Sequence, residues 1–315
     1  MPVSPPVLSQ PDVVVRLRAA GCVYAEAEAG ILISAAGTPA ELATMVERRV
    51  AGLPLEQIVG WAEFYGLRIA VEPDVFVPRR RTEFLVSHAI ELVGGDDGGT
   101  GQTIDVARRP DDHGDTPAKP RTVVVDLCCG SGAIGASLAT MLNQVELYAA
   151  DVDSAAVRCA RHNTAGAGAK VFQGDLYDAL PAGLRGRVDL LVVNAPYVPV
   201  EEIRLMPPEA RDHEPLFTLS GGLDGLDVQR RVAADAARWL APGGHVLLET
   251  SDRQAPETVE IMSRSGLAPR LARSEELDAT VVVGTRPALV GTLAAVVGTR
   301  PSPDATPPSP EAARD

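Results

Sequence analysis

The sequence predicts an α/β protein with a mostly parallel sheet, an antiparallel last strand and a small helical N-terminal part. Between residues 122 and 250, short segments rich in Val, Leu and Ala alternate with segments whose apolar residues recur at helical spacing. The strand segments lack polar–apolar alternation, which is typical of parallel strands buried on both faces. With 315 residues, the chain is long enough for two domains.

Residues 1–62 are predicted to form a helical domain. Apolar residues recur at helical spacing over residues 11–21 and again over residues 38–52. The second stretch begins with Thr38 as a helix N-cap and has Glu41 three residues later, which is the spacing of a capping box. We therefore expect amphipathic helices that pack together as a small bundle.

Residues 63–93 are predicted to connect this bundle to the sheet. Polar and apolar residues alternate on both sides of Glu72, Pro73 and Asp74. This pattern predicts a short β-hairpin that turns at these three residues. A helical pattern follows over residues 82–93.

Two segments are predicted to lack packed structure. Residues 94–121 are rich in Gly, Asp and Pro and nearly devoid of apolar residues, so we expect a flexible acidic linker. Residues 288–315 are expected to be a disordered, Pro-rich tail. The hexapeptide VVGTRP fits a closing strand at 282–287 and recurs at 296–301, where we assign it no function.

Residues 122–287 are predicted to hold the sheet and its helices. The expected strands cover residues 122–127, 145–152, 170–176, 188–197 and 243–250, and the expected helices cover residues 132–142, 154–165 and 226–240. Residues 267–287 contain two strand-like segments with no helix between them, which predicts an antiparallel end to the sheet.

Composition restricts the class of partner. The net charge is −13 and no basic stripe is visible, which argues against free nucleic acid as a partner. No apolar run is long enough to cross a membrane, and the N-terminus lacks the pattern of a secretory signal. The four cysteines and five histidines show no metal-binding spacing. We therefore expect a cytoplasmic protein with reduced thiols and no metal, acting on a protein or a small molecule.

A glycine-rich turn follows the first strand of the sheet, just after Asp126. The turn consists of Cys128, Cys129, Gly130, Ser131 and Gly132. Ligands of open parallel sheets bind at the carboxyl ends of strands, where glycines allow close approach and a helix offers free amide groups. The turn fits either a cofactor site or a structural role. The adjacent cysteines can be small residues that fill a tight turn, since no histidine is placed beside them.

Acidic residues end the next two strands at the same edge. Asp151 is placed to accept the hydroxyls of a ribose. Asp175 is placed to accept an exocyclic adenine amine while Leu176 packs against the ring. Each acid alone could instead be a helix N-cap. Together with Asp126, and with Asn194 at a fourth strand end, they predict one ligand-binding crevice.

The fourth strand ends in Asn194, Ala195, Pro196 and Tyr197. The Asn194 side chain carries a carbonyl oxygen, and Pro196 frees the Ala195 backbone carbonyl from strand pairing. Two acceptors at one place suit the hydrogens of an NH2 group, and Tyr197 offers a flat face for a planar amide or aryl amine. Holding such a nitrogen in one orientation favours its attack on an electrophilic methyl group. The alternative is a proline turn after an edge strand.

These features resemble the class I S-adenosylmethionine-dependent methyltransferases, and more narrowly the protein-glutamine N5-methyltransferases that modify peptide-chain release factors. The fourth-strand signature of that family is Asn-Pro-Pro-Tyr. Residues 54–67 resemble its interdomain segment, and residues 77–86 resemble its Ile-Pro-Arg-Pro-Glu-Thr-Glu element. Residues 213–227 resemble its Glu-Pro and Gly-Gly-x-Asp-Gly-Leu-Asp block. The resemblance runs from about residue 11 to 287, leaves out the linker, and implies a Rossmann-like methyltransferase sheet over residues 122–287.

The resemblance implies methyl transfer from S-adenosyl-L-methionine to the side-chain amide nitrogen of a protein glutamine. A release factor is one candidate substrate, and residues 1–62 would help to recognise it. The cofactor-binding residues implied are Asp126, Cys128, Cys129, Gly130, Ser131, Gly132, Asp151, Asp175, Leu176 and Asn194. The substrate-binding and catalytic residues implied are Asn194, Ala195, Pro196 and Tyr197.

The sequence departs from the family pattern at four positions. Ala195 replaces a Pro, Cys128 replaces the first Gly of the cofactor loop, and Arg80 and Arg81 replace Pro and Glu. These departures indicate a divergent member whose substrate can differ from a release factor. Two other interpretations stay open. One is an enzyme that methylates adenine of nucleic acid or another small amide or amine, and the other is a cofactor-binding scaffold without catalysis.

Overall fold

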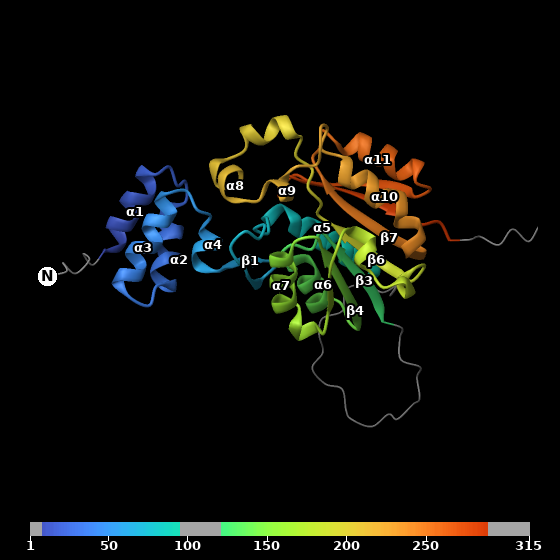
Figure 1. Cartoon of the computed structure of the whole chain (residues 1–315), viewed down its shortest axis with the longest axis horizontal. Coiled ribbons are helices and arrows are strands. Elements are labelled where there is room, and N and C mark those ends of the chain that lie inside the picture. The colour runs from blue at the N-terminus through green and yellow to red at the C-terminus, as the bar shows by residue number, and fades with distance from the viewer. Residues whose placement is uncertain (1–7, 95–120, 289–315) are drawn as a thin grey trace, which may run out of the picture.

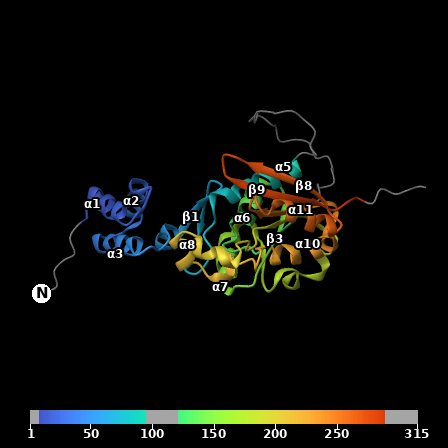
Figure 2. The same cartoon turned by 90° about the horizontal axis from the view of Figure 1, so that it is seen from above.

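The computed structural model describes residues 8–94 and 121–288. The remaining residues, which hold most of the predicted linker and tail and the second VVGTRP copy, lie outside the described part of the chain. A helical bundle stands at one end, and a sheet flanked by helices forms the rest (Figures 1 and 2). Among the described residues, no helix combines the length and apolar character needed to span a bilayer.

The bundle consists of four helices whose apolar faces share one small core. They are α1 (Gln10–Ala19), α2 (Ala25–Ala35), α3 (Pro39–Val50) and α4 (Leu55–Val59). The predicted N-cap of α3 is present, because Thr38 Oγ1 accepts the Glu41 N–H at 3.1 Å. The Glu41 carboxylate accepts the N–H of Gly37, at 2.8 Å. The sequence pattern had not singled out α2.

The hairpin exists, but its predicted turn at residues 72–74 was wrong. Strands β1 (Trp61–Phe64) and β2 (Leu67–Ala70) pair around Tyr65 and Gly66. Both turn residues have positive φ, 51° and 72°, as two-residue hairpin turns require. The Tyr65 N–H is held by the carboxylate of Glu83 at 2.9 Å, which ties the hairpin to the first turn of α5.

The large sheet has seven strands and confirms the predicted fold class. In chain order they are β3 (Thr122–Leu127), β4 (Val145–Asp151), β5 (Lys170–Gln173), β6 (Val188–Val193), β7 (Leu240–Thr250), β8 (Ala268–Ser274) and β9 (Ala279–Thr285). Their spatial order is β5-β4-β3-β6-β7-β9-β8. The first five are parallel, and β9 pairs antiparallel with both β7 and β8. Strand β3 lies between β4 and β6, so the chain runs outward from β3 in both directions. At such a reversal of strand order, a crevice forms at the carboxyl ends of the strands.

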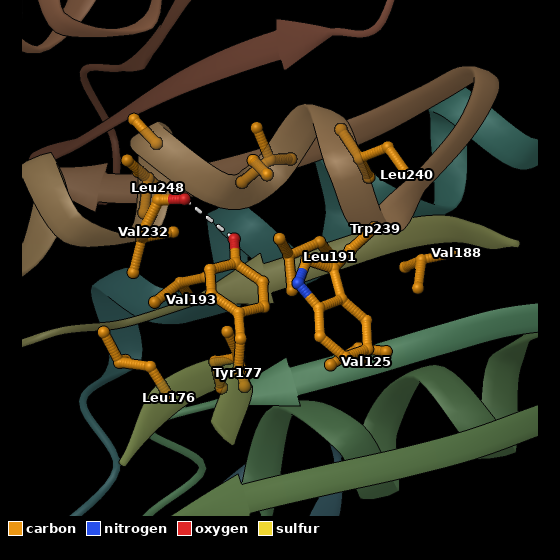
Figure 3. Packing of buried hydrophobic residues seen from close by; sticks show 14 of the residues in the cluster. Val125, Leu176, Tyr177, Val188, Leu191, Val193, Val232, Trp239, Leu240 and Leu248 are labelled. Carbon is orange, nitrogen blue, oxygen red and sulfur yellow. Dashed lines mark hydrogen bonds between the residues drawn. The ribbon is translucent and has the colours of Figure 1, made fainter. Parts of the chain in front are cut away.

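Helices cover both faces of the sheet. On one face lie α5 (Glu83–Gly94), α6 (Ala133–Met141) and α7 (Ser154–Asn163); on the other lie α10 (Asp227–Trp239) and α11 (Ala255–Arg264). Figure 3 shows the hydrophobic core on the face covered by α10 and α11. There Tyr177 stacks on Trp239 and donates a hydrogen bond from its hydroxyl to the Val232 carbonyl at 2.8 Å. Helix α11 was not among the predicted elements.

A run of short helices crosses from the sheet toward the bundle. It comprises η5 (Val200–Leu205), α8 (Pro208–His213) and α9 (Leu216–Leu219). Helix α8 lies between the bundle and the sheet in both views (Figures 1 and 2). The buried guanidinium of Arg49 on α3 contacts the carboxylates of Glu28 and of Glu209 on α8, each at 2.6 Å. This ion pair links the helical domain to the segment that borders the site.

Candidate functional site

A cavity of about 610 Å³ opens at the carboxyl ends of the parallel strands, next to the reversal at β3. Its volume is in the range of small-molecule and cofactor sites, about 300–1,000 Å³. Predicted site residues that line it are Cys128, Cys129, Gly130, Ser131, Asp151, Asp175, Leu176, Asn194, Ala195, Pro196 and Tyr197. The predicted residues Asp126 and Gly132 are not among the lining residues, although they flank the part of the turn that is.

Asp126, at the end of β3, is only 1% exposed. Its Oδ2 accepts the Gly135 N–H of α6 at 3.0 Å, whereas Oδ1 has no partner among the described residues. Burial, reinforced by the nearby charge of Asp151, raises the pKa of Asp126 to about 7. A buried acceptor without a partner is costly, so this oxygen favours a donor or a positive charge at the site.

The turn after β3 needs left-handed backbone. Cys128, Gly130 and Gly132 have φ of 56°, 53° and 77°. A Cβ on Gly132 would lie 2.9 Å from the Cα of Ala160 on α7, so only glycine allows this approach. Burial raises the pKa of both cysteine thiols in the turn, which keeps them neutral and favours packing over a nucleophilic role.

Asp151 and Asp175 hold local partners. The Asp151 carboxylate accepts the Gly130 N–H at 2.9 Å and the Asp153 N–H at 3.0 Å, which closes the glycine-rich turn. Asp153, not Asp151, provides the N-cap of α7. Asp175 pairs with Arg231 at 2.7 Å and leaves its other oxygen unengaged among the described residues.

Asn194 and Ala195 follow the last residue of β6. The Nδ2 atom of Asn194 donates a hydrogen bond to Thr82 Oγ1 at 3.2 Å. No hydrogen bond within the described residues engages Asn194 Oδ1 or the Ala195 carbonyl oxygen. Two acceptors at the strand tip are therefore available beside the cavity.

Residues 221–225, a glycine-rich segment, pack against the loop of residues 194–198 that follows β6. The Gly221 N–H donates to the Val198 carbonyl at 2.9 Å, and Gln254 Nε2 donates to the Tyr197 carbonyl at 2.9 Å. A Cβ on Gly225 would lie 2.3 Å from the Tyr197 carbonyl oxygen. Glycine at this position lets the block pack directly against the loop.

The Tyr197 ring is held at its hydroxyl and over its face. The hydroxyl donates to Glu249 Oε1 at 3.1 Å, and the guanidinium carbon of Arg81 lies 5.7 Å from the ring centroid. Arg81 Nε is 3.4 Å from the same Glu249 oxygen. Glu249 is 3% exposed, its Oε2 has no partner in the described chain, and burial raises the pKa of this carboxyl.

Several cavity-lining residues with polar or charged side chains were missed as site residues in the sequence. They include Arg79, Arg81, Thr82, Glu214 and Glu249. Glu249 lies one residue before the end of β7, so the rule that singled out the acids at other strand ends could have found it. The others lie before the sheet or in the crossing segment, where Arg79 pairs with the buried Glu214. Their closeness to Asn194 is a tertiary effect.

Comparison with known proteins finds methyltransferases. The model of the methyltransferase small domain matches residues 115–206. The release factor glutamine methyltransferase of Streptomyces coelicolor is 39% identical over 210 residues, which is 67% of each chain. That of Geobacter sulfurreducens is 33% identical over 253 residues, or 79% of each chain. A 4-amino-L-phenylalanine/4-methylamino-L-phenylalanine methyltransferase of Streptomyces pristinaespiralis is 36% identical over 221 residues, covering 70% of this chain and 69% of that protein.

Fold, cavity and relatives together define a class I methyltransferase that uses S-adenosylmethionine. Within that class, the chain belongs to the release factor glutamine methyltransferase family. The residues present fit the cofactor. Asp126 offers an unpartnered buried oxygen, and the left-handed turn from Cys128 to Gly132 brings backbone to the cavity wall.

Proposed function

We propose that this chain transfers a methyl group to the side-chain amide nitrogen of a glutamine in a protein, namely a peptide-chain release factor. The observation that carries the proposal is the pair of unengaged acceptors, Asn194 Oδ1 and the Ala195 carbonyl, at the cavity edge. The relatives from S. coelicolor and G. sulfurreducens are release factor glutamine methyltransferases, which supports the choice of substrate.

In this proposal the residues around the β3 turn bind the cofactor. Asp126 and the turn from Cys128 to Gly132 hold its methionine part. Asp151 accepts the ribose hydroxyls, since each carboxylate oxygen can accept more than the one backbone bond it already has. The free oxygen of Asp175 accepts the adenine amine, and Leu176 lies against the ring.

The acceptor residues act by orientation. The cofactor supplies an electrophilic methyl group when bound. An amide nitrogen is a poor nucleophile because its lone pair is delocalised into the carbonyl. Asn194 and Ala195 each accept one N–H hydrogen and direct that lone pair toward the cofactor pocket, while Tyr197 lies against the amide plane. Orientation of this kind can lower a barrier by about 7–11 kcal/mol. The nitrogen releases one proton to solvent as the new bond forms.

The helical domain, residues 1–62, is proposed to help bind the protein substrate. Its link through Arg49 to Glu209 on α8 places it next to the segment whose Met206 and Phe217 line the cavity. A protein partner in the cytoplasm agrees with the net charge of −13, which disfavours adenine in nucleic acid as the acceptor.

A second candidate acceptor is the aryl amine of an amino acid. The relative from S. pristinaespiralis is named for such a substrate and is about as similar as the release factor enzymes. An aryl NH2 presents the same two hydrogens and the same flat face. Ala195 and Arg81, where the sequence departs from the family pattern, line the same cavity as Asn194 and Tyr197.

Labelling with radioactive cofactor tests these alternatives. The purified chain is incubated with a cell extract and labelled S-adenosylmethionine, and mass spectrometry identifies the labelled species. The proposal expects label on a glutamine of a release factor. Label on a free amino acid would favour the second candidate. Label on nucleic acid alone, or cofactor binding with no label on any species, would contradict both.

A further inference from the structure

Arg81 lines the cavity near Tyr197 and has a half-exposed cationic side chain. It lies in η1 (Arg80–Thr82), directly before the residue that orients Asn194. Its side chain is 47% exposed and lines the cavity. Its Nε lies 3.4 Å from Glu249, and no hydrogen bond within the described residues engages its two terminal nitrogens. These nitrogens are therefore available to a ligand of the cavity that Arg81 lines.

Arg81 has a longer ion-pair contact than the arginines near it. The neighbouring Arg79 is already paired with Glu214, and Arg231 is paired with Asp175. Glu249 lies 3.4 Å from Arg81 and also accepts the Tyr197 hydroxyl. Glu249 therefore shares its Oε1 atom between the two neighbours. The terminal nitrogens of Arg81 can still donate hydrogen bonds to an anion beside the Tyr197 ring.

We infer that Arg81 is a specificity-determining residue that binds a carboxylate of the methyl acceptor, a role that rests on the acceptor site proposed above for Asn194 and Ala195. A guanidinium binds a carboxylate through two parallel hydrogen bonds, which gives direction as well as charge. The guanidinium carbon lies over the Tyr197 ring, 5.7 Å from its centre, so a carboxylate of an acceptor held at Asn194 and Tyr197 would be within its reach.

The family pattern has Glu where this chain has Arg81. A glutamate there would stand next to Glu249 and repel a carboxylate, so the exchange inverts the charge preference at this end of the cavity. The carboxylate can come from two sources. It can be the α-carboxylate of a free amino acid that carries an aryl amine, or an Asp or Glu side chain beside the glutamine of a peptide.

Two matched pairs of acceptors separate these sources. The first pair is 4-amino-L-phenylalanine and its carboxamide. The second is a glutamine peptide with Asp beside the glutamine and the same peptide with Asn. The full chain is expected to prefer the charged member of at least one pair by about 10- to 100-fold in kcat/KM. The pair that shows the preference identifies the source.

Two variants attribute the preference to one side chain. Arg81→Gln is expected to abolish the preference by slowing transfer to the charged member only, while cofactor affinity measured by calorimetry stays within about twofold. Arg80→Gln is the matched control, because Arg80 is exposed, lies next in sequence and does not line the cavity. It removes the same charge and should keep the preference.

The inference is overturned if the full chain prefers the charged member of neither pair, absence of transfer included, or if Arg81→Gln keeps the preference. The proposed function fails differently. Labelling of an extract that requires Asn194 but shows no charge preference leaves the acceptor site standing and removes only the role of Arg81. Labelling that does not require Asn194 removes the acceptor site itself.

Discussion

Asn194 donates its side-chain NH2 group to the Thr82 hydroxyl at 3.2 Å, across 112 residues of sequence. This bond fixes which end of the Asn194 amide faces Thr82, so the carbonyl oxygen faces the other way. Thr82, the last residue of η1, thereby orients the Asn194 side chain at the tip of β6. The orientation of this side chain therefore depends on a segment that precedes the sheet in the sequence.

The ring face and the hydroxyl of Tyr197 should contribute unequally to the rate of methyl transfer. Tyr197→Phe keeps the ring and loses the bond to Glu249, so we expect transfer to fall by about tenfold or less. Tyr197→Ala removes the flat face and should lower transfer by about 100-fold. Initial rates with labelled cofactor measure both. If the Phe variant is as impaired as the Ala variant, the hydroxyl rather than the ring is what the acceptor needs.

Asp151→Ala should weaken cofactor binding by about 10- to 100-fold, because it removes the proposed ribose acceptor and frees the Gly130 N–H. Asp153→Ala removes a neighbouring carboxylate that caps α7 and should mainly cost stability, about 1 kcal/mol. Calorimetry of cofactor binding distinguishes the two variants. Equal affinity losses would mean that the ribose lies elsewhere.

Asp126 should make the free protein less stable as the pH rises. Its folded pKa of about 7 exceeds the unfolded value of 3.8, so the folded state keeps the proton that the unfolded state loses between these values. Stability is therefore fully present below about pH 4 and falls by an amount on the order of 4 kcal/mol up to pH 7. Asp126→Asn should remove this fall. A stability difference between the two proteins that does not change with pH, measured by urea unfolding, would contradict the raised pKa.

Gly132 and Gly130 offer a matched test of the turn. Both have left-handed φ, but an added Cβ meets Ala160 at 2.9 Å only at Gly132 and finds open space at Gly130. Gly130→Ala should cost about 1 kcal/mol of unfolding free energy from backbone strain alone. Gly132→Ala should cost about 2–4 kcal/mol, because a steric term is added. Equal losses of unfolding free energy in the two variants, measured with denaturant, would show that α7 can shift away from the added Cβ.

The sequence predicted the sheet well because buried strands and amphipathic helices differ in period. It misplaced the hairpin turn because Tyr65 is not a usual residue at positive φ, whereas Pro73 is a conspicuous turn residue. Helices α2 and α11 were missed as separate elements. Their apolar residues bury against neighbours that only the folded chain supplies.

The site residues likewise fall into those that sequence patterns could group and those that they could not. Acids at the ends of parallel strands could be grouped from sequence, because those ends meet at one edge. Glu249 obeys this rule and should have been included. Thr82, Arg81 and Glu214 could not be grouped this way, because they reach the cavity from segments outside the parallel strands.

The acceptor role of Asn194 is tested most directly by Asn194→Ala, assayed for methyl transfer and for cofactor affinity on the same preparation. We predict that transfer falls by about 100-fold or more, since one preorganised polar contact is lost, while cofactor affinity stays within about threefold. Unchanged transfer in this variant would contradict the account, because the acceptor nitrogen would then be held by other groups.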